Sequence, residues 1–431
     1  MRKKKTTQLA KAIATLLLPL MLNGAWAQGT EDDWGDDDWA LVPESPWQFN
    51  GFLEAAAGKF LQDNSVQSTS SLMELRNRLE LNYSHDLFEL SAKGDLLYNE
   101  LVSDTQWQTR EFNISASPLD YLDIKLGRQV LTWGTGDYLF LNDLFAKDWQ
   151  SFFSGREDEY LKAPSDSLRT SWYLGDFSLD IAWTPEFTPD NYLTGARFSF
   201  YSPMAGAIIA PGDDFAVETR DDGQWSARLA TSSNGVEYAL YGYHGYWTTP
   251  QGANQAGQGY FPRLNTWGAS VRMPLGQGLF NTEFAYYHSL EDKGSNKANV
   301  ANSQIRFLLG YEQELMKNLT AGVQYYLEKT QDYDAMAASS PAPETLVDEN
   351  RQLLTLRLTY RAMQQKLTYS LFGFYSPTDS DAYLRPSISY RQDDNWSYAL
   401  GANVFLGKHE YSFFGQHQDN TNAWLRVRYQ F

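Results

Sequence analysis

The sequence lacks cysteine altogether and has only five histidines in 431 residues. A chain that must stay unfolded while it crosses an oxidising compartment avoids wrong disulfides most simply by having no thiols, so the absence of cysteine suits an exported protein. A lipid-hydrolysing Ser–His enzyme is not expected either, because histidine is scarce and the Gly-x-Ser-x-Gly motif is missing. We therefore predict no catalytic residues.

Long apolar runs are missing too, because no segment holds the 18 or more consecutive apolar residues of a membrane helix. The apolar run near the N-terminus spans only residues 12–22. It follows the basic residues Arg2 to Lys5 and precedes the small-residue site Ala25-Trp26-Ala27, which is the order found in a signal peptide. We predict a signal peptide at residues 1–27, with cleavage before Gln28.

Removing residues 1–27 takes away five basic side chains and no acid from a chain of formal net charge −18, so the mature protein is strongly acidic. An acidic envelope argues against nucleic acid as a partner. Residues 28–46 are interpreted as an acidic periplasmic tail. Its segment 31–39 could offer oxygen ligands to calcium, but it lacks the spacing and terminal Glu of an EF-hand loop. We expect no metal and no other cofactor.

Aromatic residues, in contrast, make up 15% of the chain, with 27 Tyr and 14 Trp. That is more than a soluble core requires and is typical of a barrel with two interfacial aromatic girdles. From Trp47 onward the chain runs in segments of about ten residues that alternate in polarity. In residues 73–83, one parity holds Met73, Leu75, Leu79, Leu81 and Tyr83, while the other holds Glu74, Arg76, Arg78, Glu80 and Asn82. Residues 354–361 and 396–404 repeat this split.

These segments predict an all-β fold: a transmembrane antiparallel β-barrel of about 18 strands over residues 47–431, with 16 strands as the alternative. An even number of strands leaves both termini in the periplasm. Long connections alternate with short ones and are expected outside the cell at 132–166, 185–223, 248–262, 290–302 and 331–350. The predicted strands start near residues 47, 71, 87, 107, 121, 167, 176, 224, 236, 263, 279, 303, 319, 352, 366, 382, 395 and 421.

The last nine residues alternate to the end of the chain and finish on Phe431. This ending resembles the assembly signal of bacterial outer-membrane barrels. Together with a signal peptide, it favours the outer membrane of a Gram-negative bacterium over a soluble all-β protein. The implied partners are outer-membrane lipid and, through the C-terminal strand, the barrel assembly machinery.

The parity opposite the aliphatic residues predicts which side chains line the lumen. Its basic members are Arg76, Arg78, Lys93, Lys125, Arg169, Arg228, Arg272, Arg306, Arg357, Arg361, Arg385, Arg391, Arg426 and Arg428. Acids share this face at Glu74, Glu80, Glu89, Asp95, Asp180, Glu283, Glu312, Glu314 and Glu328. A basic bore in an acidic envelope favours anions as solutes. The alternative is a ladder of salt bridges that only stiffens the wall.

The connection 132–166 is unusually aromatic and charged, so its apolar groups need a surface to pack on. Folding back into the lumen as a constriction loop would supply one. Capping the rim or holding a neighbouring protomer is the alternative, and 185–223 is a second candidate lid. The candidate constriction residues are Trp133, Tyr138, Trp149, Arg156, Glu157 and Asp158.

Three short motifs within residues 122–183 carry a family resemblance. Leu126-Gly127-Arg128-Gln129, then Trp133-Gly134-Thr135-Gly136 and Asn142-Asp143, resemble the alginate-export family and related barrel families. The resemblance implies an 18-stranded barrel with an Arg-lined pore that passes an anionic polymer. Two features depart from that pattern. The lumen here mixes acids with bases, and strict parity puts Arg128 on the lipid side unless Gly127 forms a bulge.

Two functions from different classes follow. The first is an outer-membrane channel or export porin for polar, anionic solutes or an anionic polysaccharide, with an inner-membrane or periplasmic exporter as a possible partner. The second is a non-conducting or plugged surface barrel that binds a partner in adhesion or assembly. Conductance in a lipid bilayer separates the two.

Overall fold

The computed structural model describes residues 45–431 except 65–67, 204, 211–215, 255–257, 292–293, 295–296, 298–299 and 341. The predicted signal peptide and nearly all of the predicted acidic tail, including 31–39, lie outside the described residues. Within the described part, no helix has the length and apolar character to cross a membrane. Strands dominate instead, and eighteen of them form one antiparallel sheet.

The barrel strands begin within three residues of the predicted starts. They are β1 (Trp47–Phe60), β2 (Leu72–His85), β3 (Phe88–Asn99), β4 (Asp104–Leu119), β5 (Leu122–Val130), β6 (Pro164–Leu174), β7 (Phe177–Thr184), β11 (Gln224–Ser233), β12 (Val236–Tyr246), β15 (Arg263–Leu275), β16 (Gly278–Ser289), β17 (Gln304–Met316), β18 (Leu319–Thr330), β19 (Asn350–Ala362), β20 (Leu367–Ser376), β21 (Asp381–Arg391), β22 (Trp396–Gly407) and β23 (Asn422–Gln430). The prediction of an 18-stranded antiparallel barrel is confirmed.

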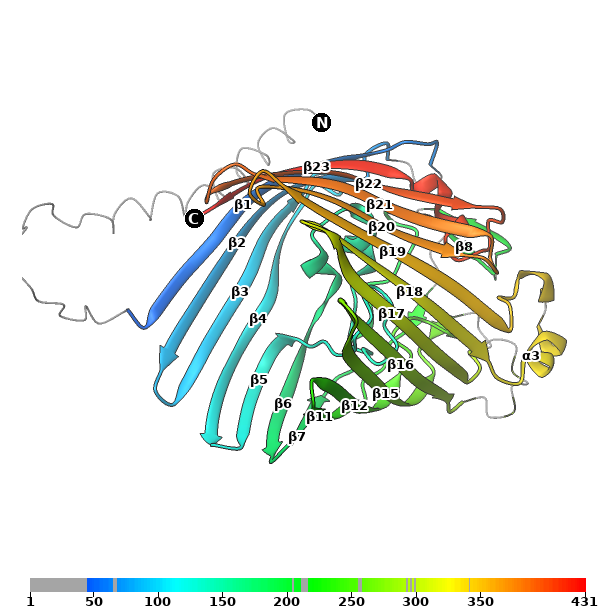
Figure 1. The fold of residues 1–431 in the computed structure, drawn as a ribbon. Coiled ribbons are helices and arrows are strands. Elements are labelled where there is room, and N and C mark those ends of the chain that lie inside the picture. The colour runs from blue at the N-terminus through cyan, green and yellow to red at the C-terminus, as the bar shows by residue number, and fades with distance from the viewer. Residues whose placement is uncertain are drawn as a thin grey trace, which may run out of the picture.

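The sheet closes on itself because β1 pairs with both β2 and β23. Every other barrel strand pairs with its neighbours along the chain, and the tilted strands wrap from blue β1 round to red β23 in Figure 1. A closed barrel leaves no strand edge unpaired, which satisfies backbone N–H and C=O groups where no water can do so. Which side of the membrane the termini face stays a prediction.

The seam between the first and last strands is completed by Phe431. Its backbone N–H donates to the carbonyl of Gly51, and Gly51 N–H donates back, both at 3.0 Å. A Cβ on Gly51 would lie 2.7 Å from the Phe431 ring and 2.4 Å from the carbonyl oxygen of Arg78, so only glycine fits here. The ring also packs at 6.0 Å from that of Phe49. The role of Phe431 as an assembly signal stays a prediction.

Aromatic pairs circle the outside of the barrel at both ends. At the end with the short turns they are Trp47–Tyr83, Tyr360–Tyr369, Tyr390–Tyr398 and Trp396–Tyr429. At the end with the long loops they are Trp183–Trp225 and Trp267–Tyr286. Between them the outer surface carries exposed leucines such as Leu309, Leu356 and Leu400. Two girdles around an apolar band are what a bilayer requires of a barrel wall.

The remaining elements lie in the long loops. Between β5 and β6 are α2 (Trp149–Ser154) and η2 (Asp158–Leu161), and between β18 and β19 are α3 (Tyr333–Ser339) and η3 (Pro343–Thr345). The β22–β23 loop contains η4 (Gly415–Asn420). Two small sheets complete the set: β8 (Phe200–Ser202) with β9 (Ala207–Ile209), and β10 (Val217–Glu218), β13 (Gly252–Ala253) and β14 (Gly259–Tyr260).

Candidate functional site

The β5–β6 loop, residues 131–163, lies inside the barrel. Leu141, Phe152 and Phe153 are almost fully buried, and they form one core with aromatic residues on the inner face of the barrel wall, such as Phe374 and Tyr383. The ring of Phe153 stands edge-on to Tyr383 at 5.5 Å. Burial of these side chains supplies the surface that an aromatic loop needs, at roughly 1.5–3 kcal/mol for each fully buried large apolar side chain. This loop is called the inner loop below.

Aromatic residues at both ends of the inner loop fix its path. Trp133 packs edge-on to Phe145 at 4.9 Å, and Tyr138 packs edge-on to Phe372 of β20 at 4.6 Å. Trp149 donates its indole N–H to Asp190 at 2.8 Å, in the loop after β7. The inner loop is therefore held by packing against the barrel wall and by a hydrogen bond to the loop that follows β7.

One polar anchor is the carboxylate of Glu283 on β16. It accepts hydrogen bonds from the backbone N–H groups of Thr135 and Gly136 and from the amide of Asn142, the last at 2.7 Å. Gly134 has φ +87°, a conformation that favours glycine, and it turns the chain so that the next two N–H groups reach this carboxylate. The Trp-Gly-Thr-Gly and Asn-Asp motifs thus meet at one acceptor on the opposite wall.

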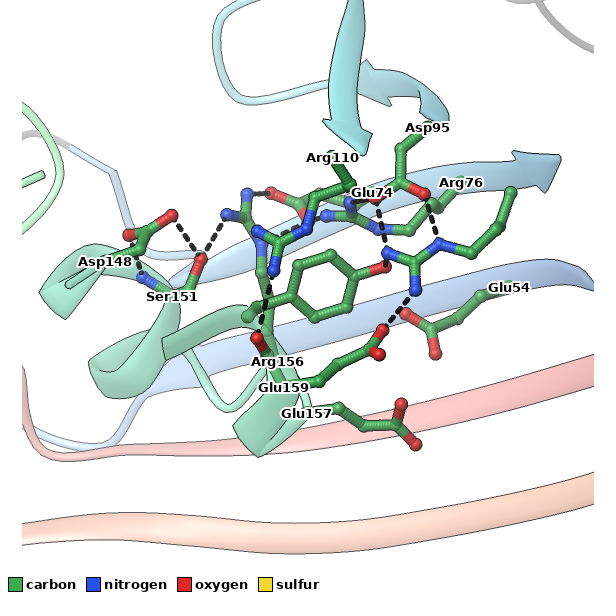
Figure 2. A network of polar contacts seen from close by, with 12 residues as sticks. Glu54, Glu74, Arg76, Asp95, Arg110, Asp148, Ser151, Arg156, Glu157 and Glu159 are labelled. Atoms are coloured by element: carbon green, nitrogen blue, oxygen red, sulfur yellow. Dashed lines mark hydrogen bonds and ion pairs between the residues drawn. The ribbon is translucent and has the colours of Figure 1, made fainter. Parts of the chain in front are cut away.

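A second anchor joins α2 and η2 to β2 and β3 (Figure 2). Arg156 donates to Glu74 at 2.9 Å through Nε, and Glu159 accepts from Arg78. Asp95 on β3 accepts from Arg78 at 2.6 Å and also pairs with the guanidinium of Arg76. Such buried pairs make little net contribution to stability when complete, but removing one partner is costly.

The ring of Tyr160 lies beneath three guanidinium groups of this second anchor. The centroid of the ring is 4.2 Å from Cζ of Arg76, 4.9 Å from that of Arg78 and 5.1 Å from that of Arg110. The ring face attracts cations, so one tyrosine of the inner loop helps to hold a cluster of like charges. Burial raises the pKa of the Tyr160 phenol well above its usual range, so the ring stays neutral at physiological pH.

A third anchor uses three further acids of the inner loop. Glu157 pairs with Arg428 on β23 at 2.8 Å, and Asp158 pairs with Arg385 on β21 at 2.9 Å. Asp137 lies 3.3 Å from Arg357 on β19. Because the three anchors reach opposite sides of the barrel, the inner loop crosses the lumen and narrows it.

All fourteen predicted pore-lining bases lie on the inward parity, and ten of them form ion pairs. Besides those above, Lys93 and Lys125 share Glu111, Arg169 and Arg228 share Asp180, and Arg306 pairs with Glu328. Most of the inward bases thus belong to a salt-bridged wall. Within the described residues, four have no carboxylate within 4.0 Å: Arg272, Arg361, Arg391 and Arg426.

The four unpaired bases differ in position. Arg272, Arg361 and Arg391 are exposed and lie on β15, β19 and β21 close to the short turns. Arg426 lies deeper on β23 and is only 9% exposed. Among the described residues, the inward acids Glu89, Glu237 and Glu314 have no basic group within 4.0 Å either, so the inner face carries uncompensated charge of both signs.

Sequence parity missed Arg110 and Glu111 on β4. Trp107 and Phe112 both face outward although their numbers differ in parity, because a register shift at Lys93/Gly94 on the partner strand inserts one extra residue into β4. Arg110 then bonds the carbonyls of Glu159 and Lys162, at 3.0 and 2.8 Å. Alternation counted from either end of β4 would have signalled the bulge. Glu54 on β1, which pairs with Arg428, was missed too.

Arg128 lies on the outer face of the barrel near the long loops. Gly127 has φ +118°, but its pairing with Asn113 and Ser167 keeps the register regular, so parity is not reset. Arg128 donates to the carbonyl of Thr109 at 2.8 Å and pairs with Asp166 at 3.2 Å. The Gly-Arg-Gln motif therefore supports the wall from outside and contributes no side chain of Arg128 to the lumen.

A cavity of about 490 Å³ lies between the inner loop and the wall formed by β20 to β23. It extends from Lys366 and Arg391, by the short turns, to Tyr138 and Asp158 of the inner loop. Arg426 lines it as well.

The histidines lie apart from this cavity. His417 is buried in η4, where its ring contacts the carbonyl of Ser199 at 3.1 Å, and burial lowers its pKa to about 4. His288 lies on the outward face, 3.4 Å from Ser303. No group of three or more potential metal ligands occurs among the described residues.

Comparisons with known proteins place the fold. No curated protein matches the chain. The solved structure of OccAB3 from Acinetobacter baumannii aligns with 10% identity and a TM-score of 0.53, covering 89% of this chain and 99% of that one. OccK5 (OpdH) from Pseudomonas aeruginosa aligns with 10% identity and a TM-score of 0.52, covering 89% of this chain and 96% of that one. OccD3 (OpdP) from the same organism aligns with 11% identity and a TM-score of 0.53, covering 89% of this chain and 90% of that one.

At such low identity these likenesses show the fold, which is that of the outer-membrane β-barrel porins. The resemblance of residues 122–183 to the alginate-export family stays a prediction. A family model matches residues 105–355, more than half of the sequence. By that match the chain belongs to the family described as "Protein of unknown function (DUF1302)".

Proposed function

We propose that this chain is an outer-membrane channel that passes small, polar, anionic solutes. The observation that carries the proposal is the set of four inward guanidinium groups that have no carboxylate partner in the described part of the chain. The acids beside the other bases, such as Asp95, Asp180 and Glu328, are already neutralised by arginines. Beside Arg391 and Arg426, where each acid that lines the adjoining cavity is paired with an arginine, a solute therefore meets uncompensated positive charge.

The inner loop favours small solutes over a polymer. Its anchors reach β2, β16, β19, β21 and β23, so a polysaccharide chain would have to pass beside a segment tied to opposite walls. The 490 Å³ cavity is within the range of small-molecule sites. An anionic polysaccharide would require the inner loop to leave the lumen.

The size of the electrostatic effect is sufficient for selectivity. Two unit charges 4 Å apart interact by about 4 kcal/mol at an effective dielectric of 20, so even partly screened arginines bias anion entry several-fold. Salt reduces the bias, because the Debye length is about 3 Å at 1 M ionic strength. Selectivity carried by Arg361 and Arg391 should therefore be larger in dilute electrolyte.

Planar bilayer recording tests the proposal. Purified protein should give open steps, and replacing both Arg361 and Arg391 by Gln should weaken the preference for anions in 0.1 M KCl. Arg128→Gln removes one positive charge from the outer face by the same type of substitution and is the control. A preference unaffected by the double substitution would overturn the assignment of selectivity to these groups.

A plugged, non-conducting barrel is the second candidate, and the three anchors of the inner loop favour it. It predicts no steps from the wild type and steps after Glu283→Ala, which removes the acceptor of Thr135, Gly136 and Asn142. As partners we propose outer-membrane lipid at the two girdles and the barrel assembly machinery at β23. A periplasmic or inner-membrane exporter is proposed only if the barrel proves closed on its own.

A further inference from the structure

The cavity between the inner loop and β20 to β23 has an unusual wall. On the inward parity, Thr368, Ser370, Ser387, Ser389 and Ser397 follow one another across β20, β21 and β22, and all line the cavity. Ala399 lies beside Arg426 in the register. Because these side chains are small, they leave space beside the barrel wall, and their five hydroxyl groups border that space.

Arg426 has no acidic partner in this cavity. It is only 9% exposed, its Nη1 is buried without a hydrogen-bond partner, and its guanidinium packs over the ring of Trp424 at 4.8 Å. Trp424 lines the same cavity, and its indole N–H is a second buried donor without a partner. Buried donors left unsatisfied are rare because each forfeits its hydrogen bond to water.

The neighbours of Arg426 show what this wall binds. Arg385 on β21 and Arg428 on β23 both line the cavity, and each holds a carboxylate of the inner loop: Asp158 and Glu157 respectively. The inner loop thus supplies an oxyanion to two of the cavity's guanidiniums and none to Arg426. Arg391, on the same face of β21 as Arg385, is also without a carboxylate.

We propose that this cavity is a binding site for a small hydroxylated oxyanion, a carboxylate or a phosphate, held by Arg426 with Arg391 as a second cation. The planar guanidinium matches either group with two parallel hydrogen bonds. The hydroxyls of Ser387, Ser389 and Thr368 bind the neutral part of the solute. The proposal rests on the proposed function, because the lumen must admit the solute, but it assigns binding to one side of the lumen.

Direct binding to the detergent-solubilised barrel tests the site without any need for conduction. Malate, a hydroxylated carboxylate, and inorganic phosphate are the probes, measured by titration calorimetry at low ionic strength, and the two titrations distinguish carboxylate from phosphate. Arg426→Gln should weaken the bound probe about 10- to 100-fold, the usual range for a lost charged hydrogen bond. Arg426→Lys should weaken binding by a smaller factor, because lysine keeps the positive charge but cannot make the two parallel hydrogen bonds of a guanidinium group.

Two further variants make the test specific. Ala399→Leu fills the cavity without changing any charge, so it should weaken binding as well. Arg128→Gln removes one positive charge on the outer face and should leave the affinity within about twofold. Migration as a heat-modifiable folded band confirms that each variant is a barrel.

The possible failures are distinguishable. No binding of either probe to the wild type, or equal affinity in Arg426→Gln and Arg128→Gln, would overturn the binding site. Anion-selective steps in the same preparation would then leave the channel standing. Probe binding that needs Arg426, in a barrel without steps, would keep the site and contradict the channel.

Discussion

Arginine has different roles in two sectors of the inner wall of the barrel. On β2 and β3, Arg76 and Arg78 share Asp95 and contact the inner loop through Glu159 and Tyr160. On β21 and β23, Arg391 and Arg426 have parity of the same kind and no carboxylate partner. The parity of a strand position predicts whether an arginine faces the lumen. The acids around the arginine determine whether it forms a structural ion pair or stays available to bind a solute.

The largest effect is expected from breaking the paired sector. Asp95→Asn removes the charge shared by two almost fully buried guanidinium groups, and loss of one partner of a buried pair costs about 3–5 kcal/mol. The measurement is the free energy of unfolding in urea, in detergent or lipid vesicles. Arg426→Gln is the contrasting variant and should change it by less than about 1 kcal/mol, because no pair is broken. An equal loss of unfolding free energy in both variants would contradict the claim that arginines are paired in one sector and unpaired in the other.

The second effect concerns pH and the attachment of the inner loop to Asp190. Burial raises the pKa of this carboxyl to about 6, although Lys147 lies nearby and Trp149 and Thr248 donate to it. Because the pKa of Asp190 is higher in the folded state than in the unfolded state, the protonated carboxyl stabilises the folded state. This stabilisation is fully present below about pH 4 and is lost as the pH rises through 6. The expected loss of loop stability is about 3 kcal/mol.

Hydrogen exchange of residues 131–163 at pH 5 and pH 7.5 measures the part of this loss that falls between the two pH values, which is about 1.4 kcal/mol. Wild-type protection should fall at the higher pH, whereas Asp190→Asn, which cannot ionise, should give the same protection at both. A wild-type loop with pH-independent protection would contradict the account of Asp190. The wall strand β12 serves as the internal reference in the same spectra.

A smaller effect is expected at the seam of β1 and β23, which lies beside the unpaired sector. Phe431→Ala removes a half-buried ring that packs on Gly51 and Phe49, for a loss of about 1–2 kcal/mol. The folded fraction in the outer membrane should fall while signal-peptide removal is unchanged. An unchanged yield of folded barrel would count against the role of the C-terminal residue.

Most of the barrel could be predicted from the sequence because alternation in a membrane wall is obligatory. A polar side chain on the outer face costs the free energy of placing a polar group in lipid, so the pattern holds over most of the eighteen strands. It failed locally on β4, where the bulge near Arg110 resets the parity. The strand starts near 167 and 352 were late by two or three residues, because their polar first residues give no apolar signal.

The pairing of the lumen could not be predicted. Glu159 and Arg78 are 81 residues apart in the sequence, and Glu157 and Arg428 are 271 residues apart (428 − 157). Nothing in alternation says which acid of the inner loop meets which wall strand. The count of inward bases over acids therefore overstated the free positive charge, since it left out Glu54, Glu111 and the acids of the inner loop.

The central claim is that the uncompensated charge beside the cavity-lining Arg391 and Arg426 is positive, is open to solutes and sets the ion selectivity of the lumen. The most direct measurement is the reversal potential of the wild-type channel across a KCl gradient, first at about 0.1 M and then near 1 M ionic strength. We predict a potential of the sign that marks chloride as the more permeant ion, shrinking at the higher salt. A potential of the opposite sign in dilute KCl would mean that the carboxylates control the lumen and would contradict the account.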